Sequence, residues 1–84
     1  MEKQEMIERI NAILIDKLVI DNHDELKPEA KLADDLGADS LDAIEVTMEL
    51  EQQFDISITE YQLRQMTEGG TVQDVYDMVA EALK

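Results

Sequence analysis

Apolar residues recur along most of the chain at intervals of three and four, which is the spacing of an amphipathic α-helix. Four stretches show this pattern, covering about residues 3–18, 40–53, 60–67 and 72–83. The alternating apolar pattern of a half-buried strand is scarce. The sequence therefore predicts an all-α protein, a four-helix bundle with a short third helix and a long loop between helices one and two.

Each predicted helix has an apolar face that we expect to point into the core. The first helix presents Met6, Ile10, Ile13 and Leu14, with Ile7 and Leu18 broadening that face, and the second presents Leu41, Ile44, Met48 and Leu50, with Phe54 at its end. The third presents Ile58, Leu63 and Met66, and the fourth presents Val72, Val75, Val79, Ala82 and Leu83, with Met78 beside them. Thr59 with Gln62 predicts a capping box, and Thr71 predicts a cap.

Residues 19–39 form the long predicted connection. Pro28 stops a helix from continuing through it. A loop of this length in a small domain is usually functional or packed compactly on the core. We expect Leu26, Leu32 and Leu36 to attach it to the bundle.

Composition narrows the function. The chain has 84 residues and no cysteine, which indicates one small domain over residues 1–84 and excludes disulfides and thiolate chemistry. A polar N-terminus and the lack of a long apolar run predict a cytoplasmic monomer that does not insert into membranes. Twenty-one acids against seven bases give a net charge of −14, which argues against nucleic-acid binding and favours basic partner surfaces.

The acids are concentrated in one segment. From Leu32 to Leu63 there is no Lys or Arg, but there are nine acids: Asp34, Asp35, Asp39, Asp42, Glu45, Glu49, Glu51, Asp55 and Glu60. Such a cluster is either a solvated surface or a docking surface for basic proteins. Its position around Ser40 favours docking.

Ser40 lies in the run Leu36-Gly37-Ala38-Asp39-Ser40-Leu41-Asp42, where a loop leads into the second helix. A hydroxyl here is either an ordinary helix cap or an exposed group at the positive end of a helix dipole, where a phosphate ester is favourable. A catalytic serine is disfavoured because the single histidine, His23, lies in a polar loop and no G-x-S-x-G motif exists. No catalytic residue and no metal site is predicted: none of the calcium loops that could start at Asp34, Asp35 or Asp39 has both Gly at position 6 and Glu at position 12.

This run, followed by Ile44-Glu45, Met48-Glu49-Leu50-Glu51 and Phe54-Asp55, resembles the prosthetic-group site of acyl carrier proteins, and the resemblance covers nearly the whole chain. It implies that a phosphopantetheinyl transferase moves 4′-phosphopantetheine from coenzyme A onto Ser40. The arm then carries acyl groups as thioesters between synthases, reductases and transferases of fatty-acid or related biosynthesis. The chain itself is then a carrier and not an enzyme.

The resemblance also assigns roles to individual residues. Asp39 matches the residue that helps to place the serine and the metal in the transferase complex. Basic patches on partners are contacted by acids of the second and third helices, here Asp42, Glu45, Glu51 and Glu60. The acyl chain tucks between these helices, where the lining residues are Ile44, Thr47, Leu50, Ile58, Leu63 and Met66.

Three departures from the family pattern stand out. Thr47 replaces a usual apolar residue, and it either bonds back to the Ala43 carbonyl or adds polarity to the pocket wall. Arg64 replaces a usual acid, and the connection at residues 67–71 is longer than usual. These changes leave open a specialised carrier for a polyketide or modified-lipid pathway. Outside this class, the alternatives are an unmodified acidic adaptor that binds basic proteins and, less favoured, an autonomous hydrolase.

Overall fold

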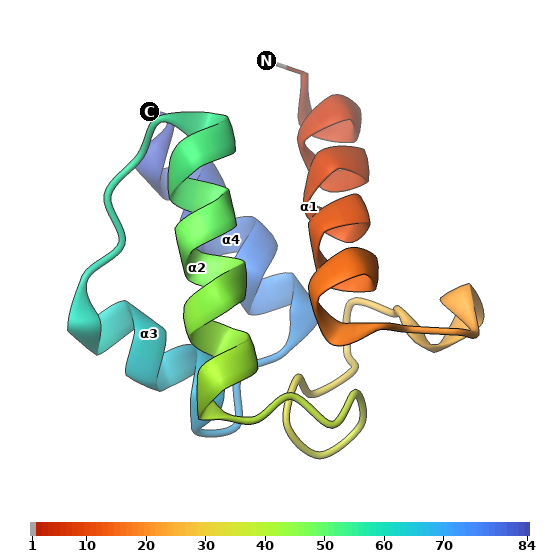
Figure 1. The fold of residues 1–84 in the computed structure, drawn as a ribbon. Coiled ribbons are helices and arrows are strands. Elements are labelled where there is room, and N and C mark those ends of the chain that lie inside the picture. The colour runs from red at the N-terminus through yellow and green to blue at the C-terminus, as the bar shows by residue number, and fades with distance from the viewer. Residues whose placement is uncertain (1) are drawn as a thin grey trace.

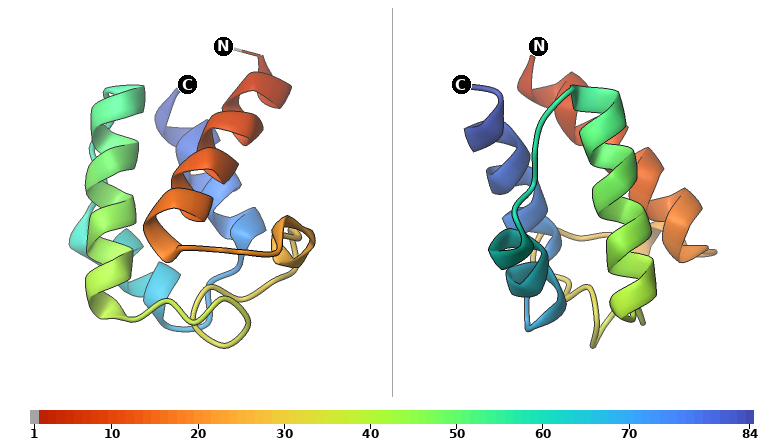
Figure 2. Two further views of the ribbon diagram at one scale, coloured as in Figure 1. Left: turned by 45° about the vertical axis from the view of Figure 1, so that its right-hand side comes forward. Right: turned by 60° about the vertical axis from the view of Figure 1, so that its left-hand side comes forward.

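Four α-helices form where the apolar spacing predicts them. The computed structural model describes residues 2–84 and contains α1 (Lys3–Leu18), a 3-10 helix η1 (His23–Glu25), α2 (Ser40–Phe54), α3 (Glu60–Thr67) and α4 (Val72–Ala82). The helices α1, α2 and α4 pack side by side along the bundle, and the short α3 lies across one side of it (Figures 1 and 2). The all-α prediction and the short third helix are therefore confirmed.

Local capping explains where the last two helices begin. Thr59 accepts from Gln62 N at 3.1 Å, while the Gln62 side chain accepts from Thr59 N at 2.8 Å. Thr71 and Asp74 form the same reciprocal arrangement at the start of α4. Both predicted caps are confirmed, and each box satisfies two backbone donors that a helix start leaves free.

A single hydrophobic cluster lies between the helices. Its fully buried side chains come from three helices: Ile10 and Leu14 of α1, Val46 and Leu50 of α2, and Val72, Val75 and Val79 of α4. Burying each such side chain contributes about 2 kcal/mol to the free energy of unfolding. The predicted inner faces of α1 and the first two turns of α4 are thus correct.

The predicted inner face of α2 was partly wrong. Leu41, Ile44 and Met48 are 65%, 42% and 55% exposed. The buried residues of this helix are instead Ala43, Val46, Thr47, Leu50 and Phe54. Apolar residues stand on two faces of α2, so helical spacing alone does not select between them. Val46, Leu50 and Phe54 belong to the core cluster, and the small Ala43 and the internally bonded Thr47 are buried on the same helix.

The end of α4 also departs from the prediction. Ala82 and Leu83 lie at the surface, with Leu83 39% exposed, and the helix ends at Ala82. Val79 is the last buried residue of α4, so its final turn lies past the core. Burial raises the pKa of the Tyr76 hydroxyl above its ordinary value, and a hydrogen bond to Asn11 on α1 partly opposes the rise.

The long connection packs against the bundle as predicted. Leu32 is 3% exposed, and Leu26 and Leu36 pack half-buried against the core. Three backbone hydrogen bonds join the connection to the α3–α4 turn: Leu32 N to Gly70 O, Val72 N to Ala30 O, and Gln73 N to Pro28 O, at 3.0, 2.9 and 2.8 Å. Gly70 is required here, since a Cβ would lie 2.6 Å from Gln65 O.

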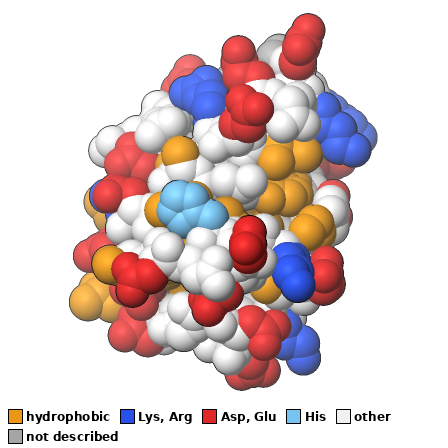
Figure 3. Space-filling model, turned by 90° about the vertical axis from the view of Figure 1, so that its right-hand side faces the viewer, with side chains coloured by type: hydrophobic (Ala, Val, Ile, Leu, Met, Phe, Trp, Pro, Cys, Tyr) orange, Lys and Arg blue, Asp and Glu red, His pale blue; other side chains and the backbone are white. Residues whose placement is uncertain are grey.

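Both ends of the described chain lie at one end of the bundle, and the long connection and the start of α2 lie at the other (Figure 1). The face that carries α1 and the long connection shows Asp and Glu side chains scattered among a few basic ones, with the histidine at the surface (Figure 3). The start of α2 therefore lies at the same end of the bundle as the folded connection that leads into it.

Candidate functional site

The loop before α2 is folded by its own backbone. Ala38 N donates to Leu32 O at 2.8 Å, and the Asp35 carboxylate accepts from Lys31 N at 2.8 Å. Gly37 adopts a φ of +73°, in the left-handed region that favours glycine. These bonds fix the direction from which the chain enters α2.

Asp39, the residue before Ser40, caps the helix. Its Oδ1 accepts from Asp42 N at 2.9 Å, and Asp42 Oδ2 accepts from Asp39 N at 3.2 Å. The two carboxylates therefore form a reciprocal capping box. Ser40 is therefore not the cap of this helix, because the cap position is occupied by its neighbour.

Ser40 is the first residue of α2, and its side chain is exposed. Among the contacts found for residues 2–84, none is made by its hydroxyl. The nearest acids in sequence, Asp39 and Asp42, point their carboxylates at backbone N–H groups. An alcohol so placed is an accessible acceptor for a group brought by another protein, and the partial positive charge of the helix start favours a phosphate on it.

The four predicted docking acids differ in their surroundings. Glu45 and Glu60 are exposed, whereas Asp42 is half-buried in the capping box. Glu51 is also half-buried, and its Oε2 accepts from Ile58 N at 3.0 Å. Only two of the four therefore lie fully open to a partner.

Sequence reasoning missed one feature of this surface. The exposed side chains of Leu41, Ile44 and Met48 occupy successive turns of α2, immediately after Ser40 and next to Glu45. They were assigned to the core because their spacing is helical. The excess of apolar positions on α2 was the signal that could have indicated a second apolar face.

The predicted acyl-lining residues differ in burial. Thr47, Leu50 and Met66 are buried, Ile58 and Leu63 are half-buried, and Ile44 is exposed. The Thr47 hydroxyl donates to Ala43 O at 2.8 Å, as one of its two predicted roles requires. The polarity of Thr47 is therefore satisfied inside its own helix.

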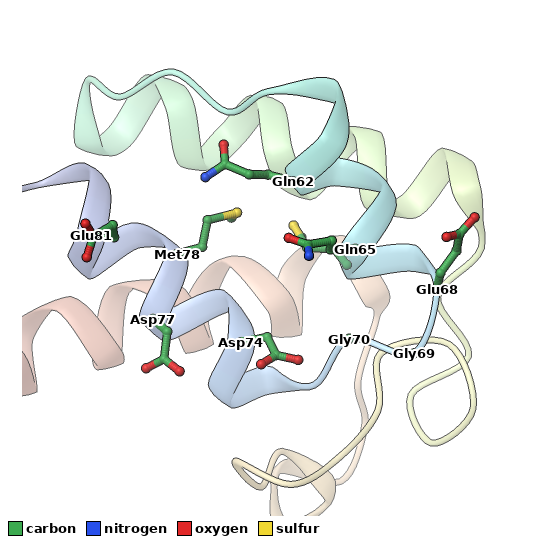
Figure 4. A pocket seen from close by; sticks show the side chains of 10 residues that line it. Gln62, Gln65, Glu68, Gly69, Gly70, Asp74, Asp77, Met78 and Glu81 are labelled. Carbon is green, nitrogen blue, oxygen red and sulfur yellow. The ribbon is translucent and has the colours of Figure 1, made fainter.

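A separate hollow of about 600 Å³ lies between α3 and α4. Gln62 and Gln65 reach into it from α3 and Met78 from α4, while Asp77 points away (Figure 4). Of the predicted acyl-lining residues, Met66 alone borders this hollow. It is therefore distinct from the predicted acyl site.

Two further observations concern the part of the chain that the structure describes. Within residues 2–84, no three His, Cys, Asp or Glu side chains come together as a group that could hold a metal ion. Nor does any helix there have the length and apolar character needed to span a membrane.

Comparison with known proteins agrees with this geometry. The family described as "Phosphopantetheine attachment site" matches residues 8–79. The acyl carrier proteins of Chlorobium phaeovibrioides and Chlorobium luteolum are each 40% identical to this chain over 81 residues, which cover 96% of the chain and 99% of each relative. That of Chlorobium phaeobacteroides is 38% identical with the same coverage. The family is one of phosphopantetheine-bearing carriers and not of enzymes, and this chain belongs to it as a member of the acyl carrier protein family.

Proposed function

We propose that Ser40 bears the 4′-phosphopantetheine group and that residues 1–84, as one carrier domain, transport acyl groups as thioesters on that arm. The observation that carries this proposal is that Ser40 is exposed while Asp39 performs the capping that a serine at this place would otherwise provide. The hydroxyl has no structural task to compete with modification.

The residues fit the group chemically. A phosphodiester on Ser40 adds a negative charge at the start of α2, where the helix dipole stabilises an anion by about 0.5 kcal/mol. In the transfer, the Ser40 oxygen forms a bond to phosphorus and the pyrophosphate bond of coenzyme A breaks, with the nucleotide as leaving group. The hydroxyl proton passes to a base of the transferase. Asp39 directly precedes Ser40 in the sequence. In this proposal it helps to place the serine and the transferase metal.

Partners with basic patches dock on α2 and the start of α3. Glu45 and Glu60 are exposed, and Asp42 is half-exposed in the first turn of α2. The exposed apolar side chains of α2, Leu41, Ile44 and Met48, lie on the same helix. Individually weak, salt-sensitive contacts around an apolar centre suit a carrier that visits a transferase, synthases and reductases in turn.

The acyl chain, in this proposal, lies between α2 and α3. The buried and half-buried side chains of Thr47, Leu50, Ile58, Leu63 and Met66 offer an apolar lining there, with Ile44 at the outer edge. Since the Thr47 hydroxyl is bonded to Ala43 O, its polarity is satisfied inside α2. This removes one reason to prefer a polyketide or modified-lipid pathway over fatty-acid biosynthesis.

The test is the intact mass of the purified chain before and after incubation with coenzyme A, magnesium and a broad-specificity phosphopantetheinyl transferase. The expected result is a gain of one phosphopantetheine that Ser40→Ala abolishes. Ser57 is the second serine and is also exposed, so Ser57→Ala is the matched control and should still gain the group. A folded, unmodified protein that gains no mass would contradict the assignment, as would a Ser40→Ala variant that still gains it.

A further inference from the structure

Glu51 differs from the other predicted docking acids because its carboxylate is used inside the protein. Its Oε2 accepts a hydrogen bond from Ile58 N at 3.0 Å, and both residues are half-buried. The bond reaches seven residues along the chain, from the last turns of α2 to the residue just before the cap of α3. A hydrogen bond to an ionised acceptor is stronger than one between neutral groups.

The main chain of Glu51 holds the same connection. Its carbonyl oxygen accepts from Asp55 N, and also from Ile56 N at 3.3 Å. Three backbone N–H groups of the α2–α3 connection, those of Asp55, Ile56 and Ile58, therefore end on this one residue. The main-chain bonds close the end of α2, and the side-chain bond carries the restraint on to α3.

Fixing Ile58 also fixes the start of α3. The next residue, Thr59, is the cap of that helix and is joined to Gln62 in its capping box. Leu63 and Met66 follow within the next two turns. The Ile58 backbone therefore lies at the point where the chain turns into α3.

Glu45 provides the contrast. It lies on the same helix and is exposed, and no hydrogen bond or ion pair of its carboxylate is found among residues 2–84. A basic group of a partner can approach it freely, whereas one approaching Glu51 has to compete with the Ile58 N–H. The two glutamates carry the same carboxylate group, but only that of Glu51 accepts a hydrogen bond from the backbone.

We infer that Glu51 is a positioning residue that sets the placement of α3 over α2 as a hydrogen-bond acceptor, and is not a docking charge. This inference rests on the proposed carrier function, because the placement of α3 would affect the shape of the proposed acyl site. Ile58, Leu63 and Met66 border that site in the proposal. The inference replaces the docking role that family resemblance gave to Glu51 and leaves Glu45 as the freest docking acid of α2.

Two substitutions separate the charge from the hydrogen bond. Glu51→Gln removes the charge but keeps a carbonyl oxygen at the same reach, whereas Glu51→Asp keeps the charge but is one methylene too short. The same pair at Glu45 is the matched control. The first measurement is amide hydrogen exchange at Ile58 in the unloaded protein, followed by NMR.

Glu51→Asp is expected to speed Ile58 exchange about tenfold, and Glu51→Gln by no more than about threefold. Both Glu45 variants should leave it unchanged. The second measurement is the kcat and KM of the transferase with each variant: Glu51→Gln should keep KM within about twofold of the parent, whereas Glu45→Gln should raise it several-fold, an effect that added salt diminishes.

The inference is overturned if Glu51→Asp leaves Ile58 exchange unchanged, or if Glu51→Gln raises KM as much as Glu45→Gln does. Failure of the carrier function itself would look different. The parent chain would then gain no phosphopantetheine, and Ile58 exchange would still decide whether Glu51 positions α3.

Discussion

The two ends of α2 are stabilised in opposite ways. At its start, Asp39 and Asp42 cap the helix with their own side chains and backbone, three residues apart. At its end there is no basic residue in the last turn. There Arg9 of α1 donates to Gln53 O at 3.0 Å, and its guanidinium lies 4.8 Å from the centroid of the Phe54 ring.

The difference corresponds to what each end does. Because the start of α2 is capped by its own residues, Ser40 takes no part in the cap and no other helix is needed beside the proposed attachment site. An end that carries the negative pole of the helix dipole gains from a cation, and α1 supplies it. The start of α2 is thus the proposed site of modification, whereas its C-terminal end is joined to α1 through Arg9.

Removing the contacts of Arg9 with the end of α2 should have the largest effect on stability. Arg9→Ala deletes the hydrogen bond to Gln53 O and the contact over the Phe54 ring, and we expect it to lower the free energy of unfolding by about 1.5 kcal/mol. Urea denaturation measures this. Arg64→Ala removes the same charge from an exposed position on α3 and is the control, expected to change stability by less than about 0.5 kcal/mol.

If the two arginine substitutions lower the free energy of unfolding equally, the change in net charge causes the loss of stability, and the contact with the end of α2 does not. Phosphopantetheine transfer to a folded Arg9→Ala protein should continue, because the start of α2 does not depend on α1 for its cap. Loss of transfer in a folded variant would break the proposed independence of the two ends.

At the start of α2 the expected loss is smaller. Asp39→Ala removes an N-cap and should cost about 1 kcal/mol in the same urea measurement, while Asp39→Asn retains an acceptor oxygen and should cost only a few tenths (~0.3). Asp34→Ala is the control, since Asp34 is an exposed acid of the same loop. An Asp39→Asn protein as unstable as Asp39→Ala would show that the carboxylate charge, and not the hydrogen bond to Asp42 N, matters.

The same contrast explains what the sequence could predict. Caps are local patterns, so the box of Thr59 with Gln62 and the cap at Thr71 were predicted from the sequence, although the return bond from Asp74 was not. The apolar faces of α1 and most of α4 were also predicted, because each has one dominant stripe. On α2 two stripes compete, and the exposed one at Leu41, Ile44 and Met48 was mistaken for core.

Contacts between segments that are distant in the sequence could not be predicted, because no local sequence pattern indicates them. Arg9 and Gln53 are 44 residues apart, and nothing in either neighbourhood indicates the pairing. The bond from Ile58 N to Glu51 depends on how the α2–α3 connection turns. Of the candidate site, the placement of Ser40 at a helix start could be predicted, but its freedom from capping depended on which of two adjacent caps, Asp39 or Ser40, the backbone would use.

The third change proposed at these two ends is expected to raise stability. Asp55 closes α2 with a φ of +54°, a conformation in which glycine is less strained, and its carboxylate lies at the negative end of the helix. Asp55→Gly should raise the free energy of unfolding by about 0.5 kcal/mol in urea. Asp55→Ala removes the charge but keeps a Cβ in the left-handed conformation, so it should be less stable than the glycine variant by about 1 kcal/mol. If the alanine and glycine variants are equally stable, the backbone conformation of Asp55 is not strained, and the end of α2 depends on charge alone.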